Sequence, residues 1–277
     1  MSGPPRQILE TTPRVMASPE PNFLGAFLGL WTMTWKSRLT WRQVARLFCL
    51  IFAMPALILL TVGSGAEKAY LAFALGFYQF LLLPISCLST FGPLIRDELQ
   101  ADTIGFLITR PLTRAKLFLL KFLCLTLWMQ ILFGLSAAML LGVGLIKQID
   151  GVVSMAPWFL LAQVLAVLVY GALGALFGLI TKKYMVMGVV YGFVVEVGVG
   201  MIPSNIHSLS MRHHVQNLLG NSDLAKTIMA KSDLVNLSSA GTGWAIVAIL
   251  FATTLALVGG ALMFTYREYH HSDEMQK

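Results

Sequence analysis

The sequence predicts an all-α membrane protein with six transmembrane helices, an N-terminal interfacial amphipathic helix and both termini in the cytoplasm. Three observations support this prediction. Of the 277 residues, 57% are hydrophobic and only 12% are charged, which lies well outside the usage of soluble globular proteins. Six apolar stretches are each long enough to cross a bilayer as a helix, which takes roughly 20 residues. Lysines and arginines gather in alternate connections between these stretches.

The two ends of the chain are more polar than its middle. Residues 1–22 contain five prolines and no apolar core, so we expect a disordered cytoplasmic tail and not a signal peptide. Residues 23–44 mix tryptophans with lysines and arginines, a composition too polar to cross the membrane but suited to its surface. They are expected to form the interfacial helix. Residues 267–277 are expected to form a second cytoplasmic tail.

The membrane domain is expected to occupy residues 45–266, and its predicted spans cover residues 45–62, 69–91, 117–146, 157–180, 185–203 and 243–266. With both termini inside, fifteen of the 20 lysines and arginines fall in cytoplasmic segments, and the asymmetry predicts this orientation. The five in external segments are Lys68, Lys147, Arg212, Lys226 and Lys231. The net charge of +7 therefore reflects topology beside anionic lipid, and nucleic acid is excluded as a partner.

Two features inside the spans are candidates for packing or function. Glycines in the fourth and fifth spans predict close approach of helices; they are Gly171, Gly174, Gly178, Gly192, Gly198 and Gly200. Glu196 lies near the middle of the fifth span, where a charge costs on the order of 2 to 4 kcal/mol if it faces lipid. It is either a carboxylate of the translocation pathway or dimer interface, or a structural carboxyl bonded to a neighbouring helix. Candidate partners for the structural role are Gln79, Gln130 and Gln163.

Two connections are long enough to do more than join spans: the cytoplasmic segment 92–116 and the external segment 204–242. The external segment is moderately apolar and is expected to form short helices associated with the membrane. We expect its histidines, His207, His213 and His214, to lie on a solvated or headgroup-facing surface and not to bind metal, because no cysteine or carboxylate cluster completes a site.

The cytoplasmic segment carries the most specific pattern. Ile104, Leu107 and Ile108 fall on one face of a short helix. Pro111 ends that helix, and Thr113 can cap the next one. A short amphipathic helix on the cytoplasmic side of a membrane protein is suited to docking a partner.

This segment resembles the signature of ABC-2 type transporter permeases, in which an acidic segment leads into a Gly-Thr-Leu helix followed by Pro, Arg and a later Lys. The matching positions are Glu98, Thr103, Ile104, Leu107, Pro111, Thr113, Arg114 and Lys121. The chain departs from the signature at Asp102, where glycine is usual, and at Gly105, where an acidic residue is common. The resemblance extends to the layout of an interfacial helix, six spans and a membrane-associated external segment.

The resemblance implies a permease subunit of an ATP-driven exporter, expected in the bacterial cytoplasmic (inner) membrane. Its partners would be the lipid bilayer, two copies of a cytosolic ABC ATPase and a second permease subunit, either identical or a paralogue. Glu98, Thr103, Ile104, Leu107, Pro111 and Arg114 would couple the two proteins, with Lys182 and Lys183 in a secondary role.

The chain itself is not expected to be an enzyme. It contains no G-x-x-x-x-G-K-[ST] phosphate-binding loop, so ATP and Mg²⁺ are expected on the partner ATPase, and no catalytic, cofactor or metal residue is assigned to this chain. Short external loops favour a small or amphipathic substrate. The alternative is a secondary transporter or channel without an ATPase partner.

Overall fold

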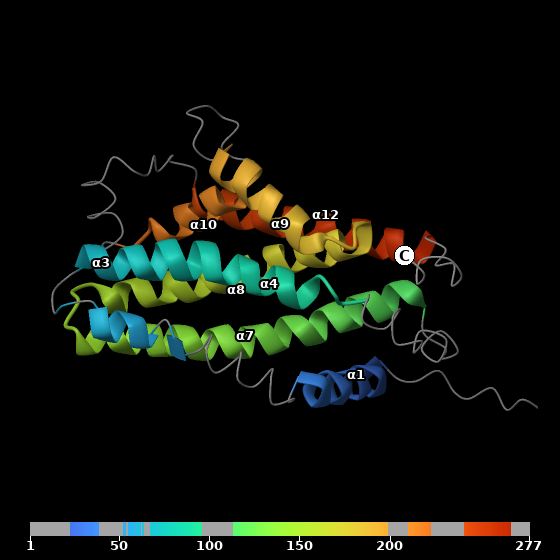
Figure 1. The fold of residues 1–277 in the computed structure, drawn as a ribbon, viewed down its shortest axis with the longest axis horizontal. Helices are drawn as coiled ribbons and strands as arrows, with labels where there is room; N and C mark the ends of the chain where they lie inside the picture. The colour runs from blue at the N-terminus through green and yellow to red at the C-terminus, as the bar shows by residue number, and fades with distance from the viewer. Residues whose placement is uncertain are drawn as a thin grey trace, which may run out of the picture.

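The computed structural model describes residues 23–38, 52–53, 55–61, 63, 67–95, 113–198, 210–222 and 241–266. All regular structure in these residues is helical (Figure 1), which confirms the all-α prediction for this part of the chain. The two predicted tails, residues 96–112 of the cytoplasmic segment, most of the span predicted at 45–62 and much of the external segment lie outside the described residues.

Four helices are long and apolar enough to cross a membrane, and they correspond to the second, third, fourth and sixth predicted spans. The first of them joins three elements end to end: α3 (Glu67–Leu71), the π-helix η1 (Ala72–Leu82) and α4 (Leu83–Phe91). The others are α7 (Arg114–Ile146), α8 (Val152–Ile180) and α12 (Thr242–Tyr266). These helices make the chain an integral membrane protein.

The predicted fifth span is shorter within the described residues. It begins as α9 (Tyr184–Tyr191), continues as the π-helix η2 (Gly192–Gly198), and its expected remainder lies outside the described part. The apolar helix it forms, Tyr184–Glu196, is below the length of a span. Six spans, with both termini inside, therefore remain a prediction.

The helix boundaries follow local chemistry. Thr113 is extended at the N-cap of α7, and its hydroxyl accepts a hydrogen bond from the Lys116 backbone N at 3.4 Å. This confirms the predicted cap. Between α7 and α8 the chain turns through Gly151, whose φ of 81° lies in the left-handed region that glycine adopts without strain.

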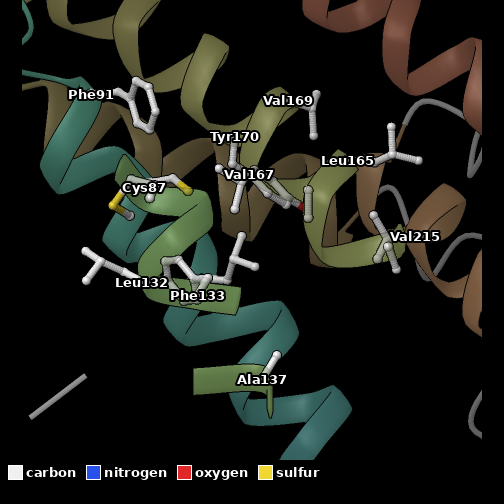
Figure 2. Packing of buried hydrophobic residues seen from close by; sticks show 14 of the residues in the cluster. Cys87, Phe91, Leu132, Phe133, Ala137, Leu165, Val167, Val169, Tyr170 and Val215 are labelled. Carbon is white, nitrogen blue, oxygen red and sulfur yellow. The ribbon is translucent and has the colours of Figure 1, made fainter. Parts of the chain in front are cut away.

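Helix α8 is the centre of the bundle and packs against α4, α7, α10 and α12. Figure 2 shows buried side chains from three helices of this core: Cys87 and Phe91 of α4, Phe133 of α7 and Tyr170 of α8. The hydroxyl groups of two buried tyrosines also tie the first long helix to α7: Tyr70 donates to the Leu140 carbonyl at 3.2 Å and Tyr78 to the Phe133 carbonyl at 3.0 Å. These bonds satisfy polar groups that would otherwise be costly in an apolar interior.

The predicted small-residue packing is present on α8, and it is directed at α4. A Cβ on Gly178 would overlap the backbone carbonyl of Gly92, and one on Gly174 would lie 3.3 Å from the Leu88 Cα. Gly192 was expected to pack similarly, but a Cβ added there would have no atom of another element within 4 Å among the described residues. The glycine prediction is therefore confirmed for α8, whereas Gly192 makes no such contact within the described residues.

The helix predicted at the membrane surface is present as α1 (Phe23–Arg38), which lies along α7 (Figure 1). The Trp35 ring meets the Trp128 ring of α7 edge to face, with centroids 4.8 Å apart. Leu30 is buried, whereas Leu24 and Leu28 are exposed. Because apolar side chains occupy both sides of α1, the helix is less amphipathic than its composition indicated.

The bundle has two ends, which are named here for use below. At the Tyr184 end, α4 finishes at Phe91, α7 begins, and α8 turns into α9 (Figure 1). At the α10 end, α7 turns into α8, and the short helix α10 (Met211–Leu219) packs against α8 and α12. There the Asn221 amide donates to the Thr242 hydroxyl at the start of α12, at 2.9 Å.

Candidate functional site

The Tyr184 end is closed by direct contact between backbones and rings. A Cβ on Gly92 would overlap the Tyr184 ring, and one on Gly188 would fall 2.5 Å from the Leu88 side chain. Together with the contact of Gly178 on Gly92, these approaches bring α4, α8 and the start of α9 into direct contact at this end.

The chain leaving α4 is fixed to α7 by a polar contact. Lys121, one turn into the predicted third span, donates from Nζ to the Leu94 carbonyl at 3.1 Å. Leu94 and Ile95 are both buried. The first residues of the cytoplasmic segment are therefore held against the bundle, and Lys121, which belongs to the signature, has a structural role here.

The predicted coupling residues can be placed only in part. Glu98, Thr103, Ile104, Leu107 and Pro111 lie outside the described residues. Arg114 is the first residue of α7 and is half-buried. Lys182 and Lys183 are exposed in the turn between α8 and α9. The fold thus brings the three described coupling candidates to the same end of the bundle.

A second region of interest is a cavity of about 370 Å³ between the η1–α4 helix, α8 and the α9–η2 helix. Its wall is mainly apolar and rich in aromatic side chains, namely Phe77, Phe80, Tyr170, Phe177, Tyr191 and Phe193. Two charged residues, Glu196 and Arg212, complete the lining. A concave, largely apolar surface with a few polar groups is typical of a small-molecule site.

Glu196 is 8% exposed and binds the start of α10. Its Oε2 accepts hydrogen bonds from the Ser210 hydroxyl at 2.7 Å and from the Arg212 backbone N at 2.8 Å. Ser210 is the N-cap of α10, and its own oxygen accepts from the His213 backbone N at 3.4 Å. The carboxylate therefore sits at a helix N-terminus, where orphan N–H groups and the helix dipole favour an anion.

None of the three glutamines expected to bond Glu196 does so in the described structure. Gln130 donates to the Val164 carbonyl at 3.0 Å, and Gln163 accepts from the Tyr78 hydroxyl at 3.3 Å. The Gln79 amide is buried and makes no hydrogen bond within the described residues. The two hydrogen bonds of Glu196 run to the start of α10, a short helix of the external segment, and the Tyr170 phenol of α8 also lies beside its carboxylate.

The second oxygen of the Glu196 carboxylate and the polar groups around it make fewer hydrogen bonds. Its second oxygen, Oε1, is buried and accepts no hydrogen bond from the described residues. The phenol groups of Tyr170 and Tyr191 lie close enough to interact electrostatically with the carboxylate. The Arg212 guanidinium stands 4.8 Å above the centre of the Phe80 ring, and within the described part of the chain it forms no ion pair with Glu196.

The histidines of α10 contradict their predicted environment. His213 and His214 were expected on a solvated or headgroup-facing surface, but they are only 8% and 2% exposed. His213 Nε2 lies 3.1 Å from the Asn217 side-chain nitrogen, and the two histidine rings meet edge to face. The prediction was wrong because α10 packs onto α8 and α12, which buries both side chains. His207 lies outside the described residues.

Sequence reasoning found Glu196 but missed the residues that surround it. Ser210 could have been recognised as an N-cap, since it precedes the helical run that begins at Met211. Arg212, Phe80, Tyr170 and Tyr191 carry no such signal, because only the packing of η1, α8, α9 and α10 brings them together.

Comparison with known proteins agrees with the membrane helices. A family model described as "ABC-2 family transporter protein" matches residues 36–200, more than half of the chain. The match covers the cytoplasmic segment, the Tyr184 end and all of the cavity wall except Arg212. Searches of curated proteins and of solved structures found no significant match. From these helices and this match we conclude that the chain belongs to the ABC-2 family of transporter proteins and is a transmembrane permease.

Proposed function

We propose that this permease exports a small or amphipathic substrate and is driven by a separate cytosolic ABC ATPase that docks at the Tyr184 end. Family membership implies such an ATPase, and the chain has no phosphate-binding loop of its own. The proposed assembly contains two ATPase copies, which would hold ATP and Mg²⁺, and a second permease subunit. In this arrangement the Tyr184 end faces the cytoplasm of a bacterial cell and both chain termini lie inside.

The observation that supports the docking site best is the hydrogen bond from Lys121 to the Leu94 carbonyl. It joins the cytoplasmic segment, which holds most of the signature, to the first turns of α7. A docked ATPase that moved this segment would therefore pull on α4 and α7 together. Arg114, Lys182 and Lys183 lie at the same end and are placed to contact the same partner.

Direct contacts between helices connect the proposed docking site to the cavity. Close packing of Gly178 on Gly92, and of Gly188 on Leu88, transmits displacement of α4 to α8 and α9 because backbone atoms in contact cannot interpenetrate. These same three helices form the cavity wall. A change in their spacing at the Tyr184 end would change the shape of the cavity.

The cavity also supports the proposed class of substrate. Its volume of about 370 Å³ lies at the lower end of the range of roughly 300 to 1,000 Å³ for small-molecule pockets. Apolar walls with charged groups suit a molecule that is apolar in one part and polar in another.

Charge placement argues against the secondary-transporter or channel alternative. Such proteins generally place several ionisable residues in their membrane helices. Within the described candidate spans and the α9–η2 helix, Glu196 is the sole acidic residue, and the basic residues Arg114, Lys116 and Lys121 all lie in the first turns of α7.

The test is co-purification of the full-length chain from native membranes in mild detergent. We expect a stoichiometric cytosolic ATPase, and we expect its recovery to fall about tenfold in Arg114→Glu and in Glu98→Ala, as for loss of a charge-assisted contact. Lys147→Glu is the matched control, because it makes the same charge reversal at the opposite end of α7. An intact, monodisperse protein without an ATPase would instead support a secondary transporter or channel.

A further inference from the structure

The cavity has a polar end and an apolar end. Phe80 and Leu88 lie eight residues apart on the first helix of the wall, and Gly188 and Glu196 lie eight residues apart on the second. Each separation corresponds to a length of roughly 10 Å or slightly more along the helix axis. Leu88 contacts Gly188 at one end of this length. At the other end Arg212 stands over Phe80, and its backbone N binds Glu196. The two charged groups are therefore together at the end nearer α10.

The polar end offers an acceptor and a donor that the described protein leaves partly unused. Glu196 Oε1 is buried, with the Tyr170 and Tyr191 phenols beside the carboxylate and no described hydrogen bond to Oε1 itself, and such an atom costs free energy unless a ligand or water satisfies it. The five N–H groups of the Arg212 guanidinium make no hydrogen bond or ion pair with the described residues. A molecule in the cavity could bond both.

The paired charges restrict which molecule fits. A cation alone would meet Arg212, an anion alone would meet Glu196, and a neutral head would leave both charges without a counter-ion. A head that carries both a cationic and an anionic group satisfies the two residues at once. The aromatic rings of Tyr170 and Tyr191, which lie beside Glu196, add favourable surfaces for the cationic group.

The remainder of the cavity suits an apolar chain. Phe77, Leu81 and Ile85 line it from one helix, and Val189 and Phe193 line it from the other. All five side chains are also substantially exposed at the surface of this chain, Phe193 by 70%. A chain too long for the cavity could therefore continue along an apolar surface towards the bilayer.

From this arrangement we propose that the cavity binds one zwitterionic amphiphile, with its ammonium group at Glu196, its phosphate or carboxylate group at Arg212 and its apolar chain towards Leu88. Such a ligand is a candidate substrate of the proposed exporter, and only its identification as a substrate rests on the proposed function. Binding itself requires neither the ATPase nor ATP.

The test is native mass spectrometry of the full-length chain, with any subunits that co-purify, in a neutral maltoside detergent. Three probes share one acyl chain: lysophosphatidylethanolamine is zwitterionic, lysophosphatidylglycerol is anionic and monoacylglycerol is neutral. We expect one tightly bound zwitterionic probe per permease, with a preference of about tenfold over the other two, as for one added charge-assisted bond.

Substitutions at the charged pair locate the site. Glu196→Gln keeps the shape and an oxygen acceptor for α10 but removes the negative charge, so binding of the zwitterionic probe should fall about tenfold while that of the anionic probe does not fall. Arg212→Gln should weaken binding of both charged probes. Asp150→Asn and Lys147→Gln are the matched controls, because they make the same changes in charge outside the cavity.

A second variant tests the cavity without touching α10. The Cβ position of Gly192 is open, and its helical backbone accepts any residue, so Gly192→Leu should fill the cavity and abolish probe binding without disturbing the fold. Gly134→Leu on α7 is its control, since it too meets open space but lies away from the cavity.

Three results would overturn the proposal: no preference for the zwitterionic probe, full binding in Gly192→Leu, or full binding in a folded Glu196→Gln. The last two would mean that the probe binds elsewhere, for instance at an interface with the second permease subunit. A negative result here combined with a co-purifying ATPase would leave the proposed transporter standing, so the two failures are distinguishable.

Discussion

The two ends of the helix bundle are held together by different interactions. At the Tyr184 end, glycines bring α4, α8 and α9 into direct contact, as where Gly178 meets Gly92. At the α10 end, one carboxylate, Glu196, holds the start of α10 through two hydrogen bonds, with a cavity beside it. The first end is fixed by close backbone contact, whereas at the second a few polar bonds add to the packing of α10 on α8 and α12.

This difference indicates how each end can move. Packed backbones tolerate little sliding, so the Tyr184 end is expected to move as one body. Hydrogen bonds to a single side chain can break and form again, and a cavity already separates the helices there. The π-helix η2 (Gly192–Gly198), a form often found at functional sites, lies on the cavity wall. We therefore expect force applied at the Tyr184 end to produce its largest displacement near α10.

The largest effect is expected from breaking the packed end. Gly178→Ala adds a Cβ that would overlap the Gly92 carbonyl, and because backbone cannot move aside easily, the change should cost about 3 kcal/mol. The apparent melting temperature in detergent should fall by roughly 10 °C.

Gly134→Ala is the control for this prediction, because its added methyl would meet open space on α7. Equal melting temperatures for the two variants would contradict the view that the Tyr184 end is held by close backbone contact.

A smaller effect is expected from breaking the polar end. Glu196→Ala removes both hydrogen bonds to the start of α10 and should destabilise the protein by about 2 kcal/mol. Limited proteolysis should cleave the segment around α10 faster, while the Tyr184 end stays protected. Asp150→Ala, in the exposed turn before α8, should change neither quantity. Unchanged protection of α10 in Glu196→Ala would show that packing on α8 and α12 holds it without the carboxylate.

The sequence predicted the parts of the fold that depend on composition and local chemistry. Four spans were predictable because long apolar helices are the way a chain satisfies its backbone in lipid. The cap at Thr113 was predictable because a hydroxyl before a helix satisfies a free N–H. That Glu196 faces protein followed from the cost of placing a charge in lipid.

The contacts of the candidate site were not predictable in the same way. Glycines in a helix indicate that another helix approaches closely, but they do not identify that helix. The contact of Gly178 with Gly92 is therefore known only from the structure. The π-helix over Ala72–Leu82 changes which side chains face inwards, and its sequence does not distinguish it from an α-helix. The partner of Glu196 lies fourteen residues later at Ser210, beyond any helical repeat.

The smallest effect on stability is expected where the cytoplasmic segment contacts the bundle. A substitution there should affect transport more than it affects stability. Lys121→Met keeps an apolar stem but removes the hydrogen bond to the Leu94 carbonyl, at a cost of about 1 kcal/mol. The ATPase should still co-purify, because the predicted docking residues are unchanged, but substrate exported per ATP hydrolysed in proteoliposomes should fall, because the segment is held less firmly. Lys116→Met, one turn earlier and exposed, is the control. Full coupling in Lys121→Met would mean that movement enters the bundle elsewhere, with the turn at Lys182 and Lys183 as the next place to test.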